Sequence, residues 1–191
     1  MSQLNLGYAM CGSFCTLKNS VSSLKELRSD GHNITPIMSE IVYNSDTRFY
    51  NCEDLKKVVT EICQNNIINS VVTAEPIGPK KLFDILVVCP CTGNTLAKIA
   101  NGITDTSVTM AVKAHLRNKK PVILAIATND ALGASAKNIG LLLNTKNIFF
   151  VPFAQDDPIG KNNSLISDFS LVKETIKYAL NGEQIQPILK K

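Results

Sequence analysis

The run from Asp84 to Asp105 constrains the fold more than any other part of the chain. Ile85 to Cys89 are all apolar, which predicts a strand covered on both faces. Pro90 to Gly93 then predict a tight turn, and the apolar spacing after Asn94 predicts an amphipathic helix. The first amides of a helix have no partner inside it, so this turn is suited to an anion or the polar edge of a flat ring.

Strand and helix patterns alternate along the rest of the chain. Strands are predicted at residues 4–11, 33–38, 69–74, 85–89, 121–127 and 147–151, and helices at 16–30, 53–65, 107–118, 131–144 and 168–180. Pro36 places the second strand at an edge, or marks its end. This alternation predicts an α/β fold, a three-layer sandwich on a mostly parallel sheet.

The size and composition suit one domain. The chain has 191 residues, and 45% of them are hydrophobic, enough for a sizeable core. We expect residues 1–182 to form this domain and 183–191 to form a loose C-terminal tail. The final helix, at 168–180, is followed by Gly182, which is typical of a helix end.

Charge and composition disfavour several classes of function. The net charge is +4, the basic residues are scattered, and there is no tryptophan, so nucleic acid is not an expected partner. No apolar run approaches the length of a membrane helix, and the first residues lack a signal-peptide pattern, so we expect a cytoplasmic protein away from membranes. The six cysteines are then expected to be thiols, and the spacings Cys11-x3-Cys15 and Cys89-Pro-Cys91 fit zinc ligands poorly. His115 is expected to be solvated on a surface helix.

Three predicted strands end in turns of small or polar residues. These are Gly12-Ser13, Pro90 to Thr95, and Thr128-Asn129. In an open parallel sheet, ligands bind outside the carboxyl ends of the strands. We therefore predict that the three turns converge on one binding site.

Each turn has a functional and an ordinary interpretation. Gly12 and Ser13 suit a phosphate, with Ser39 as a further donor, or they form a plain strand-to-helix turn with Ser39 as a helix cap. Thr92 to Thr95 offer amides and hydroxyls, or they only cap a helix, and Cys91 is a thiol candidate or a small turn residue. No catalytic set is evident from spacing.

Other polar residues are candidates for an anionic substrate. Asn129 could bind a carboxylate or an amide of a substrate, or it could only stabilise the turn at the end of its strand. Arg48 and Lys80 are loop cations that could meet an anion or simply aid solubility.

The run from Pro90 to Asp105 resembles the flavoprotein family of FMN-dependent cysteine decarboxylases. That family carries Pro-Ala-Ser-Ala-Asn-Thr followed by Ala-Lys-x-Ala-x-Gly-x-Ala-Asp. Further similar blocks cover nearly the whole chain: 11–16, 45–49, 74–82, 144–148 and 150–156. The resemblance implies a flavodoxin-like or Rossmann-like fold and homo-oligomers built from trimers.

The resemblance also implies FMN as cofactor. Its phosphate would lie at Gly12, Ser13 and Ser39, and the 92–95 turn would approach its ring and ribityl chain. The wider cofactor set comprises Gly12, Ser13, Phe14, Ser39, Pro90, Cys91, Thr92, Gly93, Asn94 and Thr95. The resemblance assigns no metal to the site.

The chain departs from the decarboxylase pattern in two places. The family's histidine after the second strand has no counterpart between Ser39 and Phe49, and its Pro-x-Met-Asn motif retains only Asn129. Within the family, the chain resembles one subunit of a two-subunit oxidoreductase that acts on a small cyclic dicarboxylate. The partner subunit resembles a nicotinamide-binding Rossmann protein, which implies NADP through the partner, and Asn129, Arg48 and Lys80 would bind the substrate.

Three alternatives stay open at this point. The site could hold FMN as a hydride relay, or hold only an anion while the partner carries out the redox step. The chain could be a non-catalytic scaffold for the partner. It could also be a flavoprotein decarboxylase of another substrate.

Overall fold

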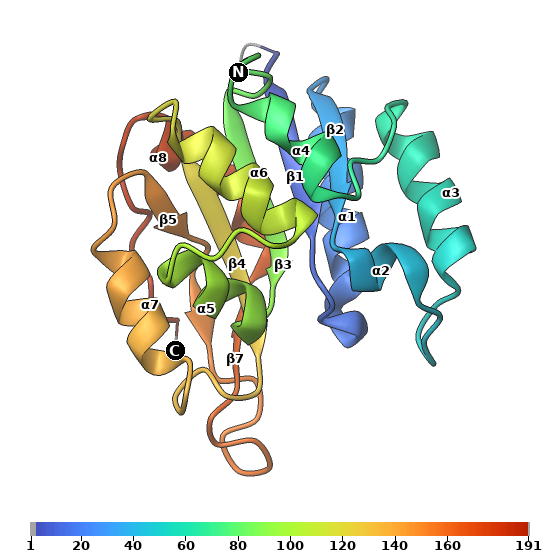
Figure 1. The fold of residues 1–191 in the computed structure, drawn as a ribbon. Coiled ribbons are helices and arrows are strands. Elements are labelled where there is room, and N and C mark those ends of the chain that lie inside the picture. The colour runs from blue at the N-terminus through green and yellow to red at the C-terminus, as the bar shows by residue number, and fades with distance from the viewer. Residues whose placement is uncertain (1–2, 191) are drawn as a thin grey trace.

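The computed structural model describes residues 3–190 and shows one seven-stranded sheet between two layers of helices (Figure 1). The main strand order is β2-β1-β3-β4-β7-β6, and β5 pairs with β4. The strands are β1 (Asn5–Met10), β2 (Asn33–Met38), β3 (Ile85–Cys91), β4 (Val122–Thr128), β5 (Ile148–Phe150), β6 (Phe153–Ala154) and β7 (Leu165–Ser167). The first five pair in parallel, whereas β7 is antiparallel to β4 and β6.

Eight α-helices and three short 3-10 turns flank the strands among the described residues. The helices are α1 (Leu17–Ser29), α2 (Glu40–Asn44), α3 (Cys52–Cys63), α4 (Val71–Ala74), α5 (Gly93–Ala100), α6 (Ser107–Leu116), α7 (Ala136–Leu143) and α8 (Val172–Leu180). The 3-10 turns are η1 (Phe14–Thr16), η2 (Glu75–Ile77) and η3 (Phe169–Leu171).

Alternate residues of the central strands enter two separate cores. Tyr8 and Val87 pack with α1, α3 and α8 on one face, and Ala9 and Val88 pack with α4, α5, α6 and α7 on the other. Figure 1 shows α4, α5 and α6 in front of the sheet and α1 behind it. The predicted three-layer α/β sandwich is confirmed, and Pro36 lies in the edge strand β2 as expected.

A buried hydroxyl network links α1 to β1 and β3. Ser20 Oγ donates to the Cys89 carbonyl oxygen at 2.5 Å, and the Tyr8 hydroxyl donates to the Ser20 carbonyl oxygen at 2.9 Å. Both side chains are fully buried, so these bonds are shielded from water. They hold the start of α1 against the carboxyl end of β3.

The strand predicted at residues 69–74 is wrong. Residues 71–74 form α4, because Ser70 and Thr73 make reciprocal capping bonds that outweigh the β-branched run. Only Ile68 bridges to the sheet, opposite Ile37. The predicted tight turn at Pro90 is also wrong, since β3 continues to Cys91 and α5 begins at Gly93.

The segment between β5 and α8 contains structure that the sequence did not predict. No strand is predicted between residues 152 and 167, but Phe153 and Ala154 form β6, and β7 follows at Leu165. These strands are too short for hydrophobic alternation to reveal them. The helix predicted from Ala131 begins only at Ala136, since turns fill the interval.

The prediction of a loose tail is wrong for residues 183–190. Gln184 Oε1 accepts from the Phe150 amide, and its Nε2 donates to the Phe150 carbonyl, both at 2.8 Å. Phe153 exchanges backbone bonds with Ile188 and Lys190. The tail therefore completes the hydrogen bonding of β5 and β6, a long-range pairing with no local sequence signal.

His115 is buried rather than solvated. Its side chain is 1% exposed, and Nε2 lies 3.1 Å from the Pro121 carbonyl oxygen, near the Phe83 ring. Burial lowers the pKa of His115 to about 4, despite the opposing effect of the Pro121 carbonyl.

We predict that Gln184→Ala lowers the free energy of unfolding by about 1–3 kcal/mol, since it leaves both backbone groups of Phe150 without their partner. Urea unfolding measures the change. Glu183→Ala is the control, since this exposed neighbour makes no such contact. Equal stability of the two variants would show that the tail is not docked.

We predict that His115 makes stability depend on acidic pH. Its folded pKa lies below its unfolded value, so its contribution is complete above pH ~6.5 and falls as pH drops toward 4, by up to about 3 kcal/mol. Chemical unfolding of wild type and His115→Gln across this range measures the difference. The variant should lose less stability on acidification, and parallel curves would contradict a buried neutral histidine.

Candidate functional site

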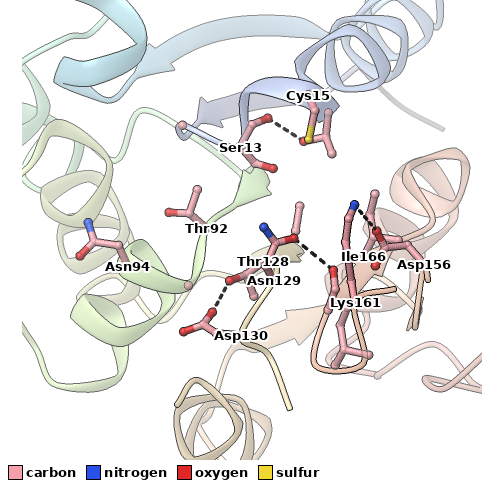
Figure 2. A pocket seen from close by; sticks show the side chains of 16 residues that line it. Ser13, Cys15, Thr92, Asn94, Thr128, Asn129, Asp130, Asp156, Lys161 and Ile166 are labelled. Atoms are coloured by element: carbon pink, nitrogen blue, oxygen red, sulfur yellow. Dashed lines mark hydrogen bonds and ion pairs between the residues drawn. The ribbon is translucent and has the colours of Figure 1, made fainter. Parts of the chain in front are cut away.

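One cavity of about 380 Å³ lies where the predicted turns meet. It is lined from β1 by Gly12 and Ser13, from β3 by Thr92, Gly93 and Asn94, and from β4 by Thr128 and Asn129. Figure 2 shows the labelled side chains of these three groups around a common space. The structure therefore brings together residues that lie far apart in the sequence, at the carboxyl edge of the parallel strands.

Parallel pairing positions the Gly12–Ser13 turn. The Cys11 amide donates to the Pro90 carbonyl at 3.2 Å, which extends the contact between β1 and β3 beyond the last paired residues. Ser13 precedes η1, and its side chain makes no capping bond to that turn. η1 runs directly into α1, and the amides of Thr16 and Leu17 are bonded within this segment, to the carbonyls of Ser13 and Phe14.

Ser39 lies buried beside this turn. Its side chain is 8% exposed, and its Oγ has no hydrogen-bond partner among the described residues. It does not cap α2, although the Ser39 amide donates to the Met10 carbonyl at 3.0 Å. A Cβ at Gly12 would lie 3.2 Å from Ile41 of α2, so the Gly12 turn and the Ser39 region are in close contact. An unpaired buried hydroxyl is costly, and here it suits a polar ligand.

The start of α5 is held rigidly. Thr92 Oγ1 accepts from the Thr95 amide at 3.3 Å, which caps the helix. Thr95 Oγ1 in turn donates to Cys11 Sγ at 3.3 Å, which links α5 to the end of β1. Thr95 therefore has a structural role, whereas Thr92 and the exposed Asn94 line the cavity.

Three buried cysteines behind the cavity walls are poor nucleophiles, whereas the exposed Cys15 lines the cavity. Burial raises the pKa of Cys11 to about 11 and that of Cys89 to about 12. It raises the pKa of Cys91 well above the ordinary thiol value. Pro90 and Cys91 are buried in β3 and support the wall rather than line it. Cys91 is thus a packed thiol, in line with its ordinary interpretation.

The hairpin formed by β6 and β7 adds a wall that the sequence did not predict. Leu165 and Ile166 line the cavity, and Lys161 Nζ lies 3.6 Å from Asp156 on the connecting loop. Figure 2 shows Lys161 extending along this side of the cavity. Ser164 Oγ donates to Asn129 Oδ1 at 3.4 Å, so the side-chain amide group of Asn129 is left for a ligand.

A second polar group lies at the start of α5. Thr128 Oγ1 donates to Asp130, and Ser135 Oγ lies 3.2 Å from both carboxylate oxygens. A Cβ at Gly93 would lie 2.6–2.9 Å from these three side chains, so glycine is required for their approach. The sequence placed Thr128 in a converging turn, as confirmed here, but it made no prediction for Asp130, which lies two residues beyond β4's last strand position.

Besides Ser39, Pro90, Cys91 and Thr95, three further predicted site residues do not line the cavity. Lys80 follows η2 and precedes β3, so it lies at the amino ends of the strands and cannot reach this cavity of its own chain. The Arg48 guanidinium lies 4.8 Å from the centre of the Phe49 ring. Phe14 packs edge-on against Tyr50 at 6.0 Å. The sequence places Lys80 in a loop, but it does not show at which end of the sheet that loop lies.

Other kinds of site find no support between residues 3 and 190. No group of three or more histidine, cysteine or acidic side chains is arranged to hold a metal ion in this part of the chain. Within the same residues, no helix has the length and apolar character needed to cross a membrane.

Residues 1–175 match the model of a family described as Flavoprotein. The chain belongs to the Flavoprotein family. This confirms the resemblance seen in the run from Pro90 to Asp105. The family match spans the cavity residues of β1, β3 and β4 together with the β6–β7 hairpin.

Two relatives show which members of the Flavoprotein family this chain resembles. It is 42% identical to the dipicolinate synthase B subunit of Bacillus subtilis over 184 residues, covering 96% of this chain and 92% of that protein. The crystal structure of the dipicolinate synthase B subunit from Bacillus halodurans is 41% identical, with a TM-score of 0.91 over 98% of this chain and 96% of that chain. The chain is thus a homologue of these dipicolinate synthase B subunits, with a flavodoxin-like fold.

A decarboxylase is a more distant relative of this Flavoprotein-family member. An FMN-dependent cysteine decarboxylase of thioviridamide biosynthesis is 25% identical, with a TM-score of 0.56 over 74% of this chain and 86% of that chain. The similarity covers less of the chain and is weaker than that to the Bacillus halodurans structure.

We predict that Ser39→Ala raises the free energy of unfolding of the ligand-free chain by about 1 kcal/mol, because it removes a buried hydroxyl that has no partner among the described residues. Urea unfolding measures the effect. Ser20→Ala is the matched control, and it should lower stability by about 1–3 kcal/mol because it breaks a paired network. Destabilisation by both substitutions would mean that Ser39 is already satisfied.

Proposed function

We propose that this protein is the B subunit of a dipicolinate synthase and takes part in the oxidation of dihydrodipicolinate to pyridine-2,6-dicarboxylate during sporulation. The oxidation uses NADP carried by the A subunit, and the B subunit holds FMN at the carboxyl edge of its sheet. The similarity to two dipicolinate synthase B subunits over almost the whole chain supports the assignment.

One observation carries the cofactor proposal: the partnerless buried hydroxyl of Ser39 beside the Gly12–Ser13 turn, among the described residues. A phosphate there would accept from Ser39 Oγ, from Ser13 Oγ and from the amides that begin η1. The adjoining cavity of about 380 Å³ falls in the usual range of ~300–1,000 Å³ for small-molecule sites. The residues present therefore fit a phosphorylated cofactor.

The remaining cavity residues define roles around that cofactor. Thr92 and Asn94 would contact the ring and ribityl chain, and a bound flavin supplies a two-electron acceptor. Asn129 and Lys161 offer an amide and a cation to a substrate carboxylate. Arg48 and Lys80 lie outside this cavity and are not part of the proposed set.

One observation favours a second candidate, a non-catalytic scaffold for the A subunit. The cavity is lined by two carboxylates, Asp130 and Asp156, against the single lysine Lys161. A dianionic substrate would be repelled unless the partner supplied further positive charge. Decarboxylation of a cysteine peptide is less supported, since no histidine occurs between Ser39 and Phe49.

The proposal also covers the cellular location and the assembly of the protein. We place it in the cytoplasm of the mother cell, in trimer-based homo-oligomers that associate with the A subunit.

We predict that the purified chain binds FMN and shows the visible absorbance of a flavin after FMN is added. Gly12→Asp should weaken FMN binding at least about 100-fold, since its carboxylate would repel the phosphate. Gly140→Asp is the control, because its Cβ meets open space on α7. A chain that takes up no FMN would sink the cofactor proposal, with circular dichroism confirming that the variants fold.

Dipicolinate synthesis separates the two candidates. The A subunit is assayed alone, with the wild-type B subunit and with the Asn129→Ala variant of the B subunit. Under the enzyme proposal, the wild-type complex is active and the variant complex is impaired, whereas a pure scaffold leaves the two complexes equally active.

A further inference from the structure

Asp130 differs from the other carboxylate of the cavity. Asp156 lies 3.6 Å from Lys161, whereas no lysine, arginine or histidine of residues 3–190 lies within salt-bridge distance of Asp130. Only the hydroxyls of Thr128 and Ser135 donate to its side chain among these residues. Asp130 is also exposed, so a ligand in the cavity can reach it.

The structure makes specific room for this carboxylate. Asp130 Oδ1 lies 2.7 Å from the place that a Cβ at Gly93 would occupy, and Thr128 Oγ1 lies 2.6 Å from it. Any larger residue at 93 would push the carboxylate away from the start of α5. Figure 2 shows Asp130 joined to Thr128, close to the turn that carries Thr92.

We propose that Asp130 is the proton acceptor for the oxidation of the dihydropyridine dicarboxylate. The inference rests on the proposed function, because it needs that substrate in the cavity. The observation that carries it is an exposed carboxylate, without a cation partner among the described residues, held at one wall by two hydroxyls and a required glycine.

Aromatisation of the dihydropyridine ring removes one hydride and one proton from adjacent saturated carbons. One C–H bond breaks with its electron pair, and that hydride is passed to the oxidised nicotinamide of the A subunit, for which a flavin held by this chain would be the relay. The second C–H proton passes to the carboxylate of Asp130, and the electron pair of that bond completes the ring. Hydride loss makes the ring cationic and this proton acidic, so an ordinary carboxylate is a sufficient base.

The charge pattern of the cavity gives the substrate an orientation. Lys161 and the Asn129 amide lie on the wall next to the β6–β7 hairpin, and Asp130 lies at the start of α5. The substrate carboxylates are attracted to the first wall and repelled from the second. A ring carbon rather than a carboxylate is therefore directed toward Asp130.

The test uses Asp130→Asn in the complex with the A subunit. Asparagine keeps an acceptor for Thr128 and the shape of the side chain, but it cannot take the proton. We expect kcat to fall by about 100-fold or more. Asp157→Asn, a carboxylate on the hairpin loop outside the cavity lining, should leave kcat unchanged.

Binding of dipicolinate to the complex with the A subunit gives a second readout. Removing a like charge should tighten the binding of this dianion by about 5-fold in Asp130→Asn, a change of ~1 kcal/mol. A merely structural aspartate would leave binding unchanged or weaken it. Calorimetry measures both proteins, with Asp157→Asn again as control.

Gly93→Ala keeps the carboxylate and displaces it, so it tests the position rather than the charge. We expect kcat to fall in Gly93→Ala, and the double variant with Asp130→Asn to lose little more than Asp130→Asn alone. Failure of wild type to bind dipicolinate would overturn the proposed function and this inference together. Binding by wild type with full kcat in Asp130→Asn would overturn only the role of Asp130.

Discussion

The parallel hydrogen-bond ladders that join β1, β3 and β4 are the constraint on which the rest of the structure depends. Ala9 pairs with Val88, and Cys91 pairs with Ile126, so the three strands end along one edge. Both faces of these strands are covered, which leaves that edge as the place where polar groups can meet a ligand. The Ser20 bond to β3 then fixes where α1 begins relative to that edge.

Sequence periodicity predicted the central strands of the sheet but not the hairpin that completes the cavity. The run from Ile85 to Cys89 and the apolar run of β4 are long enough to identify buried strands. Glycine and hydroxyl residues after them identified two walls of the cavity. The two-residue strand β6 is too short to show a periodic pattern. The hydrogen bonds of Gln184 to Phe150 also leave no local pattern, because they join residues far apart in the sequence.

The two ends of the cavity offer different chemical groups to a ligand. At one end, Ser13 lines the cavity, and the partnerless hydroxyl of the buried Ser39 lies beside the Gly12–Ser13 turn among the described residues. At the opposite side, Asp130 carries a charge that no cation of the described residues neutralises within salt-bridge distance. Such an arrangement favours a ligand whose anionic group enters beside α1 while its reacting part lies near α5.

A crystal structure of the chain soaked with FMN tests this account most directly, because it shows the ligand's position without relying on activity. The account predicts the FMN phosphate within hydrogen-bond distance of Ser13 and Ser39, with the ring against the turn at Thr92. FMN ordered on another surface would contradict it, as would an FMN-free cavity in which Ser39 Oγ is bonded to the protein itself.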